Sequence, residues 1–147
     1  MPTALMTWQP RIRTDNGKQQ IFCDWRHKFV RLTPEEKVRQ LFLHMLVEEY
    51  SYPQSLIAVE HPIKVADVQK RCDAVVFTGK LKPVAIIEFK AETIPITQKV
   101  FDQIAVYNRK LGVPFLFISN GKTTHVCRLN NDELQFLTTI PQYTELK

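Results

Sequence analysis

Apolar and polar residues alternate along the chain with two different periods, one typical of helices and one typical of strands. The segment TPEEKVRQLFLHMLVEEY (33–50) has apolar residues at helical spacing around most of its circumference, so we expect a helix that is buried on most sides. Thr33 is a capping residue, Pro34 fits the first helical position, and Glu36 completes a capping box. The few remaining polar positions form one strip, which predicts a surface position for His44.

The other periodic segments predict a mixed sheet flanked by helices. A second helix is expected from about Thr97 to Leu111, because Gly112 and then Pro114 follow it. Runs typical of strands cover residues 56–65, 71–78, 83–90, 113–119, 122–129 and, as a candidate last strand, 133–140. A strand, a crossover helix and another apolar strand imply a parallel pair. We therefore expect an α/β (α+β) fold with the element order α-β-β-β-α-β-β.

The first part of the chain is polar and has no clear period. Residues 14–20 (TDNGKQQ) are typical of a turn, and residues 21–32 mix aromatic with basic side chains. We expect residues 1–24 to form an extended N-terminal arm and residues 25–147 to form a single domain. Three aromatic side chains are expected to pack on that domain: Phe22, Trp25 and Phe29.

Composition limits the class of protein. The 147 residues make one domain, and the apolar runs are far shorter than the roughly 20 residues that span a bilayer, so we expect no membrane association. Cys23, Cys72 and Cys127 lack zinc-binding spacing, which favours free thiols in a cytoplasmic protein. The net charge of +5 favours an anionic partner, nucleic acid being the commonest, although solubility explains it equally well.

The stretch AIIEFK (85–90) places charged residues at the end of an apolar strand. If a turn separates this strand from the previous one, position 77 pairs with 84 and Asp73 lies opposite Glu88, with Cβ atoms about 5 Å apart. Two facing carboxylates repel each other, and a divalent cation such as Mg²⁺ would relieve that repulsion. The neighbouring Lys90 could then orient or deprotonate a water molecule. The alternative is an edge hairpin whose charges form a solvated cluster.

The second helix carries a further candidate pair. Its expected apolar stripe contains Gln103, and a buried glutamine needs hydrogen-bond partners. Tyr107 lies four residues later on the same face. This pair could point toward the strand ends, or it could be a satisfied core amide beside a tyrosine that reaches water. The expected stripe is Val100, Ile104, Tyr107 and Leu111.

We expect no chemical role for two residues beside the candidate charges. Glu60 could face them, but we expect an exposed position on an edge strand. Cys72 precedes Asp73, so it should point to the opposite face of its strand and contribute packing only.

The ordered set of these motifs resembles a known family. Asp73, then EFK (88–90), then QIAVY (103–107) resembles the PD-(D/E)xK nuclease superfamily with its Q-x-x-x-Y extension. The chain is more closely similar to the N-terminal nuclease domain of type I restriction enzyme R subunits (HsdR), which also occurs as a short standalone protein. The resemblance covers roughly residues 25–140, and it implies a restriction-endonuclease-like fold. Cys72 stands where the superfamily name has proline, and the chain has no P-loop and no room for a helicase motor.

The resemblance implies a role for each matching residue. Asp73 and Glu88 match the metal-binding carboxylates, which the backbone carbonyl of Phe89 often assists. Lys90 matches the catalytic lysine. The implied cofactor is Mg²⁺ or Mn²⁺.

Four more residues match with supporting roles. Gln103 and Tyr107 match the motif that supports the site and contacts DNA. Glu36 matches an acidic position of the first helix that can approach the metal, although its capping role also explains it. Arg39 is a candidate phosphate contact.

Three functions remain open. The first is a Mg²⁺-dependent DNA nuclease, with DNA as its partner and a second copy or a restriction or repair protein as a further partner. The second is a non-catalytic DNA-binding or assembly module that retains the nuclease fold. The third is an interaction or oligomer-forming protein that binds no nucleic acid.

Overall fold

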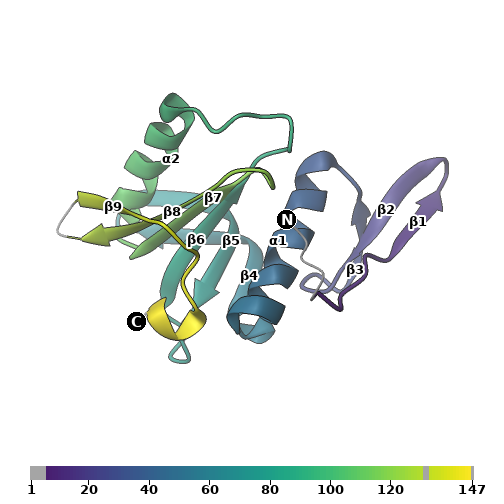
Figure 1. Ribbon diagram of the computed structural model, residues 1–147, viewed down its shortest axis with the longest axis horizontal. Coiled ribbons are helices and arrows are strands. Elements are labelled where there is room, and N and C mark those ends of the chain that lie inside the picture. Colours follow the sequence, from purple (N-terminus) through teal and green to yellow (C-terminus); the bar gives the residue numbers. More distant parts are fainter. Residues whose placement is uncertain (1–5, 131–132, 147) are drawn as a thin grey trace.

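The computed structural model describes residues 6–130 and 133–146 and confirms a mixed α+β fold (Figure 1). Its centre is a six-stranded sheet in the order β4-β5-β6-β7-β8-β9. These strands are β4 (Ile57–Val65), β5 (Val68–Phe77), β6 (Pro83–Phe89), β7 (Phe115–Ser119), β8 (Thr124–Asn130) and β9 (Glu133–Leu137). The helices are α1 (Pro34–Tyr50) and α2 (Gln98–Leu111), with short 3₁₀ turns at Gln54–Leu56 and Tyr143–Leu146.

The predicted order of elements is confirmed from α1 to β8, and β9 is the candidate last strand. Strands β6 and β7 are parallel, with Ala85 beside Phe115 and Ile87 beside Phe117, and α2 makes the crossover between them. The other neighbouring strands of this sheet are antiparallel. The wholly buried pattern of β7 reflects its place between two strands, with apolar contacts on both faces.

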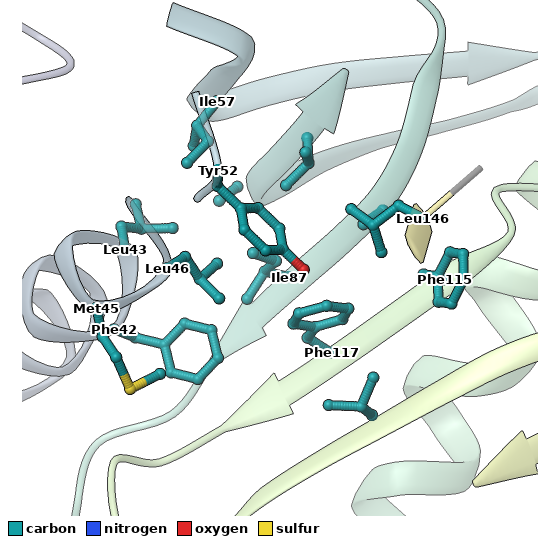
Figure 2. Close-up of a cluster of buried hydrophobic side chains, with 14 of the residues drawn as sticks. Phe42, Leu43, Met45, Leu46, Tyr52, Ile57, Ile87, Phe115, Phe117 and Leu146 are labelled. Atoms are coloured by element: carbon teal, nitrogen blue, oxygen red, sulfur yellow. The ribbon is translucent and has the colours of Figure 1, made fainter. Parts of the chain in front are cut away.

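Side chains of β6 alternate between the two faces of the sheet, and each face is covered by one helix. Ala85, Ile87 and Phe89 belong to the cluster that contains the apolar residues of α1, while Ile86 belongs to the cluster that contains those of α2. Figure 2 shows the α1 side, where residues of the helix lie near Ile87 and Phe117 from the sheet. The side chain of Tyr52 lies in the same cluster and donates a hydrogen bond of 2.9 Å to the carbonyl of Pro141.

Helix α1 begins as its sequence predicts, but His44 of its polar strip is not at the surface. The Thr33 hydroxyl accepts the Glu36 backbone N–H at 3.0 Å, which is the first half of the capping box. The prediction that His44 lies at the surface is wrong, because its ring is 6% exposed and stacks on Trp8 with 4.0 Å between ring centroids. Its Nε2 atom lies 3.0 Å from a carboxylate oxygen of Asp24. Residues from the N-terminal region therefore cover this side of the helix.

The N-terminal region is a three-stranded antiparallel sheet where we expected an extended arm. Strands β1 (Ile12–Asp15), β2 (Lys18–Cys23) and β3 (Lys28–Arg31) pair in this order on the far side of α1 from the main sheet (Figure 1). The predicted turn within residues 14–20 is confirmed, since Asn16 and Gly17 connect β1 and β2 with positive φ values of 51° and 76°. Residues 1–5 of the expected arm lie outside the described residues.

Of the three aromatic side chains expected to pack on the domain, only Trp25 does so. Trp25 packs against the α1 cluster and donates a hydrogen bond of 3.1 Å to the carbonyl of Gln54. Phe22 and Phe29 instead contact each other across β2 and β3, with ring centroids 5.3 Å apart.

The buried stripe of α2 differs from the expected one. Its buried residues are Phe101, Ala105, Asn108 and Leu111. Gln103 is exposed and Tyr107 is 36% exposed, so the prediction that both lie on the buried face is wrong. The buried Asn108 explains the error, because a polar residue interrupts the apolar period that identifies a packed face.

Two further sequence predictions concern membranes and thiols. In the described part of the chain, no helix has the length and apolar character needed to cross a membrane. The three cysteines are free thiols, and all three are buried.

A matched pair of leucine substitutions tests the core on the α1 side. Leu46 is fully buried in this cluster, whereas Leu81 is 70% exposed in the turn between β5 and β6. We expect Leu46→Ala to lower the free energy of unfolding by about 2–5 kcal/mol, because it removes buried methyl groups and leaves a cavity. Leu81→Ala should change it by no more than about 0.5 kcal/mol. Urea denaturation followed by circular dichroism measures both values, and equal losses would contradict this packing.

Candidate active site

The register between β5 and β6 brings Asp73 opposite Glu88. Ala74 pairs with Ile87 and Val75 with Ile86, and one more step along both strands reaches the two acids. The predicted pairing of Phe77 with Val84 is wrong, because a bulge after Val76 pairs Phe77 with Pro83. The bulge lies near the turn, beyond Val75 and Val76, so it does not alter the register beside the acids.

Strand β5 changes faces at Asp73. Cys72 and Val75 belong to the cluster on the α2 side, whereas Ala74 belongs to the cluster on the α1 side, so strict alternation fails between Cys72 and Ala74. Across from this point, Glu60 of β4 has a φ of 51°, a left-handed conformation that interrupts the ladder. Asp73 uses a carboxylate oxygen to accept the backbone N–H of Phe89 at 2.7 Å.

The Glu88 carboxyl group is buried beside Asp73. Glu88 is 6% exposed, and burial together with the charge of Asp73 raises the pKa of Glu88 to about 7, although Lys70 acts in the opposite direction. The alternative of a solvated cluster on an edge hairpin is therefore wrong for Glu88, since β5 and β6 are interior strands. The burial expected for Cys72 is confirmed, and it raises the pKa of this thiol to about 12.

Lys70 is a site residue that the sequence analysis missed. This residue of β5 pairs its ammonium group with the Glu88 carboxylate and lies 5.5 Å from the centre of the Tyr107 ring. The Tyr107 hydroxyl donates a hydrogen bond to the carbonyl of Gln69, which connects α2 to the same strand. No spacing rule identifies Lys70, because strict alternation along β5 fails between this residue and the segment that pairs with β6.

Glu35 of α1 is close enough to Asp73 and Lys90 to feel the charge of both. The Lys90 backbone donates a hydrogen bond of 2.9 Å to the carbonyl of Ser119, which fixes the chain as it leaves β6. Burial and the charge of Asp73 raise the pKa of Glu35, and the positive charge of Lys90 partly offsets this effect. The first helix therefore presents Glu35 to Asp73 and Lys90, a residue that the sequence analysis did not select.

Glu36 and Arg39 form an ion-pair network that contacts the backbone of Asp73. Glu36 binds Arg39 at 2.5 Å and Arg26 at 2.7 Å, and these contacts hold its pKa below the usual value although burial opposes them. Arg39 also binds the Glu60 carboxylate at 2.7 Å and the backbone carbonyl of Asp73 at 3.3 Å. Glu60 does lie on an edge strand, but its carboxylate is held by this arginine, contrary to the exposed position we expected.

The arrangement has the chemistry of a divalent-cation site. Asp73 and Glu88 offer neighbouring carboxylate oxygens, the donors that Mg²⁺ and Mn²⁺ prefer, and their mutual repulsion gives such a cation a favourable position. Within residues 6–130 and 133–146, no group of three or more Asp, Glu, His or Cys side chains is placed to bind a metal. Two carboxylates fit a Mg²⁺ site that leaves other positions to water and substrate.

The raised pKa of Glu88 predicts a pH dependence of stability in metal-free protein. Since the folded state holds this proton up to about pH 7, well above the usual value of 4.5, its stabilising effect is complete below about pH 4.5 and lost above pH 7. We expect the melting temperature in EDTA to fall between pH 5 and 8, and Glu88→Gln to reduce this fall. Thermal denaturation of both proteins across this pH range measures it. Parallel curves would contradict the assignment, and Glu92→Gln, at an exposed position, is the control.

Solved structures show where this fold occurs. A fragment assigned as an HsdR subunit of a type I restriction enzyme from Vibrio vulnificus YJ016 is similar with a TM-score of 0.55 and 23% identity; the match covers 78% of this chain and 24% of that chain. The chain thus spans about a quarter of that relative. A DUF820 protein from Anabaena variabilis ATCC 29413, assigned as a nuclease, has a TM-score of 0.51 and 12% identity, with 90% and 87% of the two chains covered. At these identities the similarities show the fold.

Sequence comparison identifies the family. No curated protein matches the chain. The family described as type I restriction enzyme R protein N terminus (HSDR_N) matches residues 34–141, a range that contains both helices, the six-stranded sheet and the acids at the ends of β5 and β6. The chain therefore belongs to the family of type I restriction enzyme R protein N-terminal domains.

Proposed function

We propose that this protein is a Mg²⁺-dependent DNA nuclease, with Mn²⁺ as an alternative metal. The observation that carries the proposal is the pair of carboxylates at the ends of β5 and β6, where Glu88 is buried beside Asp73. Burying two acids side by side is costly unless a positive charge is placed between them. In a metal-dependent nuclease, such a cation lies next to the phosphodiester that is cleaved.

Each residue of the site has a distinct task in this proposal. Asp73 and Glu88 hold the cation, helped by the Phe89 carbonyl, and the cation supplies Lewis-acid stabilisation of the charge on phosphate oxygens. Lys90 orients the attacking water or takes its proton. The bond from the Phe89 N–H fixes the Asp73 carboxylate, so that one of its oxygens is oriented before the substrate binds.

The first helix contributes through two acids with different tasks. Glu35 lies close enough to Asp73 and Lys90 to interact electrostatically with both, so it suits the acidic position near the metal better than Glu36 does. Glu36 acts as a positioning residue, because it holds Arg39 against the Asp73 backbone. This arginine is engaged by two carboxylates, which favours a structural task over the phosphate contact considered from the sequence.

The second helix contributes at the surface. Gln103 and Tyr107 are both solvent-exposed on α2, and Tyr107 is held against β5. These positions suit contacts with DNA better than support from within the core. The protein is expected to act on DNA in the cytoplasm, with a second copy or another restriction or repair protein as a further partner.

The alternative is a DNA-binding or assembly module without catalysis. The ion pair between Lys70 and Glu88 favours it, because the lysine places a positive charge where a metal ion would otherwise be needed. In that case the acids and Lys70 stabilise the sheet, and phosphate binding needs no metal. The two functions differ in metal binding and in cleavage.

Cleavage of DNA tests the proposed chemistry. We expect wild-type protein to cut DNA in Mg²⁺ or Mn²⁺, and Lys90→Ala to reduce the rate by roughly 10²-fold or more, because the water loses its orienting group. Gel electrophoresis of single- and double-stranded substrates measures the rate. Lys80→Ala, in the turn at the opposite end of β6, is the control and should cut normally. If wild type and Lys90→Ala are equally inactive on every substrate, the proposal is contradicted.

Calorimetry with Mn²⁺ separates the two functions. We expect one binding site per chain that is lost in Asp73→Asn, because the substitution removes a negatively charged ligand. Asp102→Asn, whose carboxylate binds Gln98 on the exposed side of α2, should bind like wild type. Equal heats for the two variants, or no binding to wild-type protein, would favour the module without catalysis.

A further inference from the structure

The outward face of the three-stranded sheet gathers arginine and phenylalanine side chains. Ile21 and Cys23 of β2 are buried toward the body of the protein, so the alternate positions of the sheet point outward. Register and alternation place the following residues on this outward face: Arg11, Arg13, Asp15, Lys18, Gln20, Phe22, Phe29 and Arg31. The face is thus basic and aromatic, with a single acid.

The phenylalanine rings hold two of the arginines in place. The Arg11 guanidinium lies 4.0 Å from the centre of the Phe22 ring, and that of Arg13 lies 3.9 Å from the centre of the Phe29 ring. The Arg13 Nε atom also donates a hydrogen bond of 2.8 Å to Gln20. A guanidinium that is stacked on a ring keeps its N–H edge free for an anion and loses less side-chain entropy on binding.

Positive charge is concentrated in this short segment. Residues 11–31 contain six Lys and Arg and two Asp, which leaves +4 of the total net charge of +5. One of the six, Arg26, is paired with Glu36, and Arg31 and Lys18 are exposed on the outward face. The remaining basic groups of the chain are nearly balanced by acids, so most of the net positive charge lies in this segment and favours the approach of a polyanion there.

We propose that this outward face is a DNA-binding surface that contacts the phosphodiester backbone through Arg11, Arg13 and Arg31. Several guanidinium groups on one face of a β-sheet attract the phosphates of a nucleic-acid strand, and the aromatic side chains beside them are typical of nucleic-acid-binding surfaces. The surface lies before residue 34, outside the segment that matches the family. The inference rests on the proposed function in naming DNA as the ligand.

A series of ion pairs and hydrogen bonds connects this surface to the candidate active site. Arg26, in the turn between β2 and β3, binds Glu36, which binds Arg39, which in turn binds the backbone of Asp73. The sheet is therefore fixed relative to the acids, on the other side of α1 (Figure 1). If a DNA strand binds to this sheet, its flanking part is positioned relative to the candidate active site. The sheet itself takes no part in the chemistry.

Fluorescence anisotropy with labelled duplex DNA in EDTA tests the inference, because binding is measured without metal and without cleavage. We expect the double variant Arg11→Gln/Arg13→Gln to bind on the order of tenfold more weakly at low salt. The slope of log K against log salt should fall by about 2, one for each lost phosphate contact. Lys80→Gln/Lys82→Gln removes the same charge from the turn between β5 and β6 and should leave both quantities nearly unchanged. Circular dichroism confirms that each variant is folded.

Other outcomes would overturn the inference. Equal weakening by the two double variants would mean that net charge alone attracts DNA. Competition by polyglutamate as strong as that by unlabelled duplex would mean a surface for acidic protein segments. If Arg11→Gln/Arg13→Gln cuts DNA at the wild-type rate and binds it with the wild-type affinity, the inference is refuted and the nuclease proposal remains intact. If the protein cuts no DNA but its DNA binding depends on Arg11 and Arg13, the inference is supported and the nuclease proposal is refuted.

Discussion

The hydrogen bond from the Phe89 backbone to the Asp73 carboxylate fixes the geometry on which the candidate site depends. It joins β5 to β6 at the point where β5 changes faces. The Phe89 side chain is meanwhile held in the α1 cluster, where its ring lies 5.6 Å from that of Phe42. The position of the acid is therefore set by core packing on one side and by a charge-assisted bond on the other.

Electrostatic balance explains why several acids can gather at one end of the sheet. Asp73 lies close to Glu88 and to Glu35, and its charge raises the pKa of both. The charge of Lys70 lowers the pKa of Glu88, and the charges of Lys90 and Arg39 lower that of Glu35. These cations come from β5, from the end of β6 and from α1, so the balance of charge at the site depends on all three elements.

Local sequence signals predicted those parts of the structure that local forces determine. Capping determines the start of α1, and chain connectivity determines the parallel pair around α2. Strand register determines the facing positions of Asp73 and Glu88. The face of α2 was mispredicted because a buried asparagine breaks its apolar period. Burial of His44 depends on Trp8 and Trp25, which are distant in sequence, and the contact of Lys70 with Glu88 lies beyond the break in alternation at Asp73. Such features require knowledge of tertiary contacts.

The three buried thiols give this protein internal reporters of local opening. Cys23 lies in the N-terminal sheet, Cys72 next to Asp73, and Cys127 in β8, and all three side chains are fully shielded from solvent. An alkylating reagent reaches a shielded sulfur only when the surrounding backbone separates. Its rate of reaction at each cysteine thus measures how readily the N-terminal sheet, the acidic end of the main sheet and the far strand come apart independently.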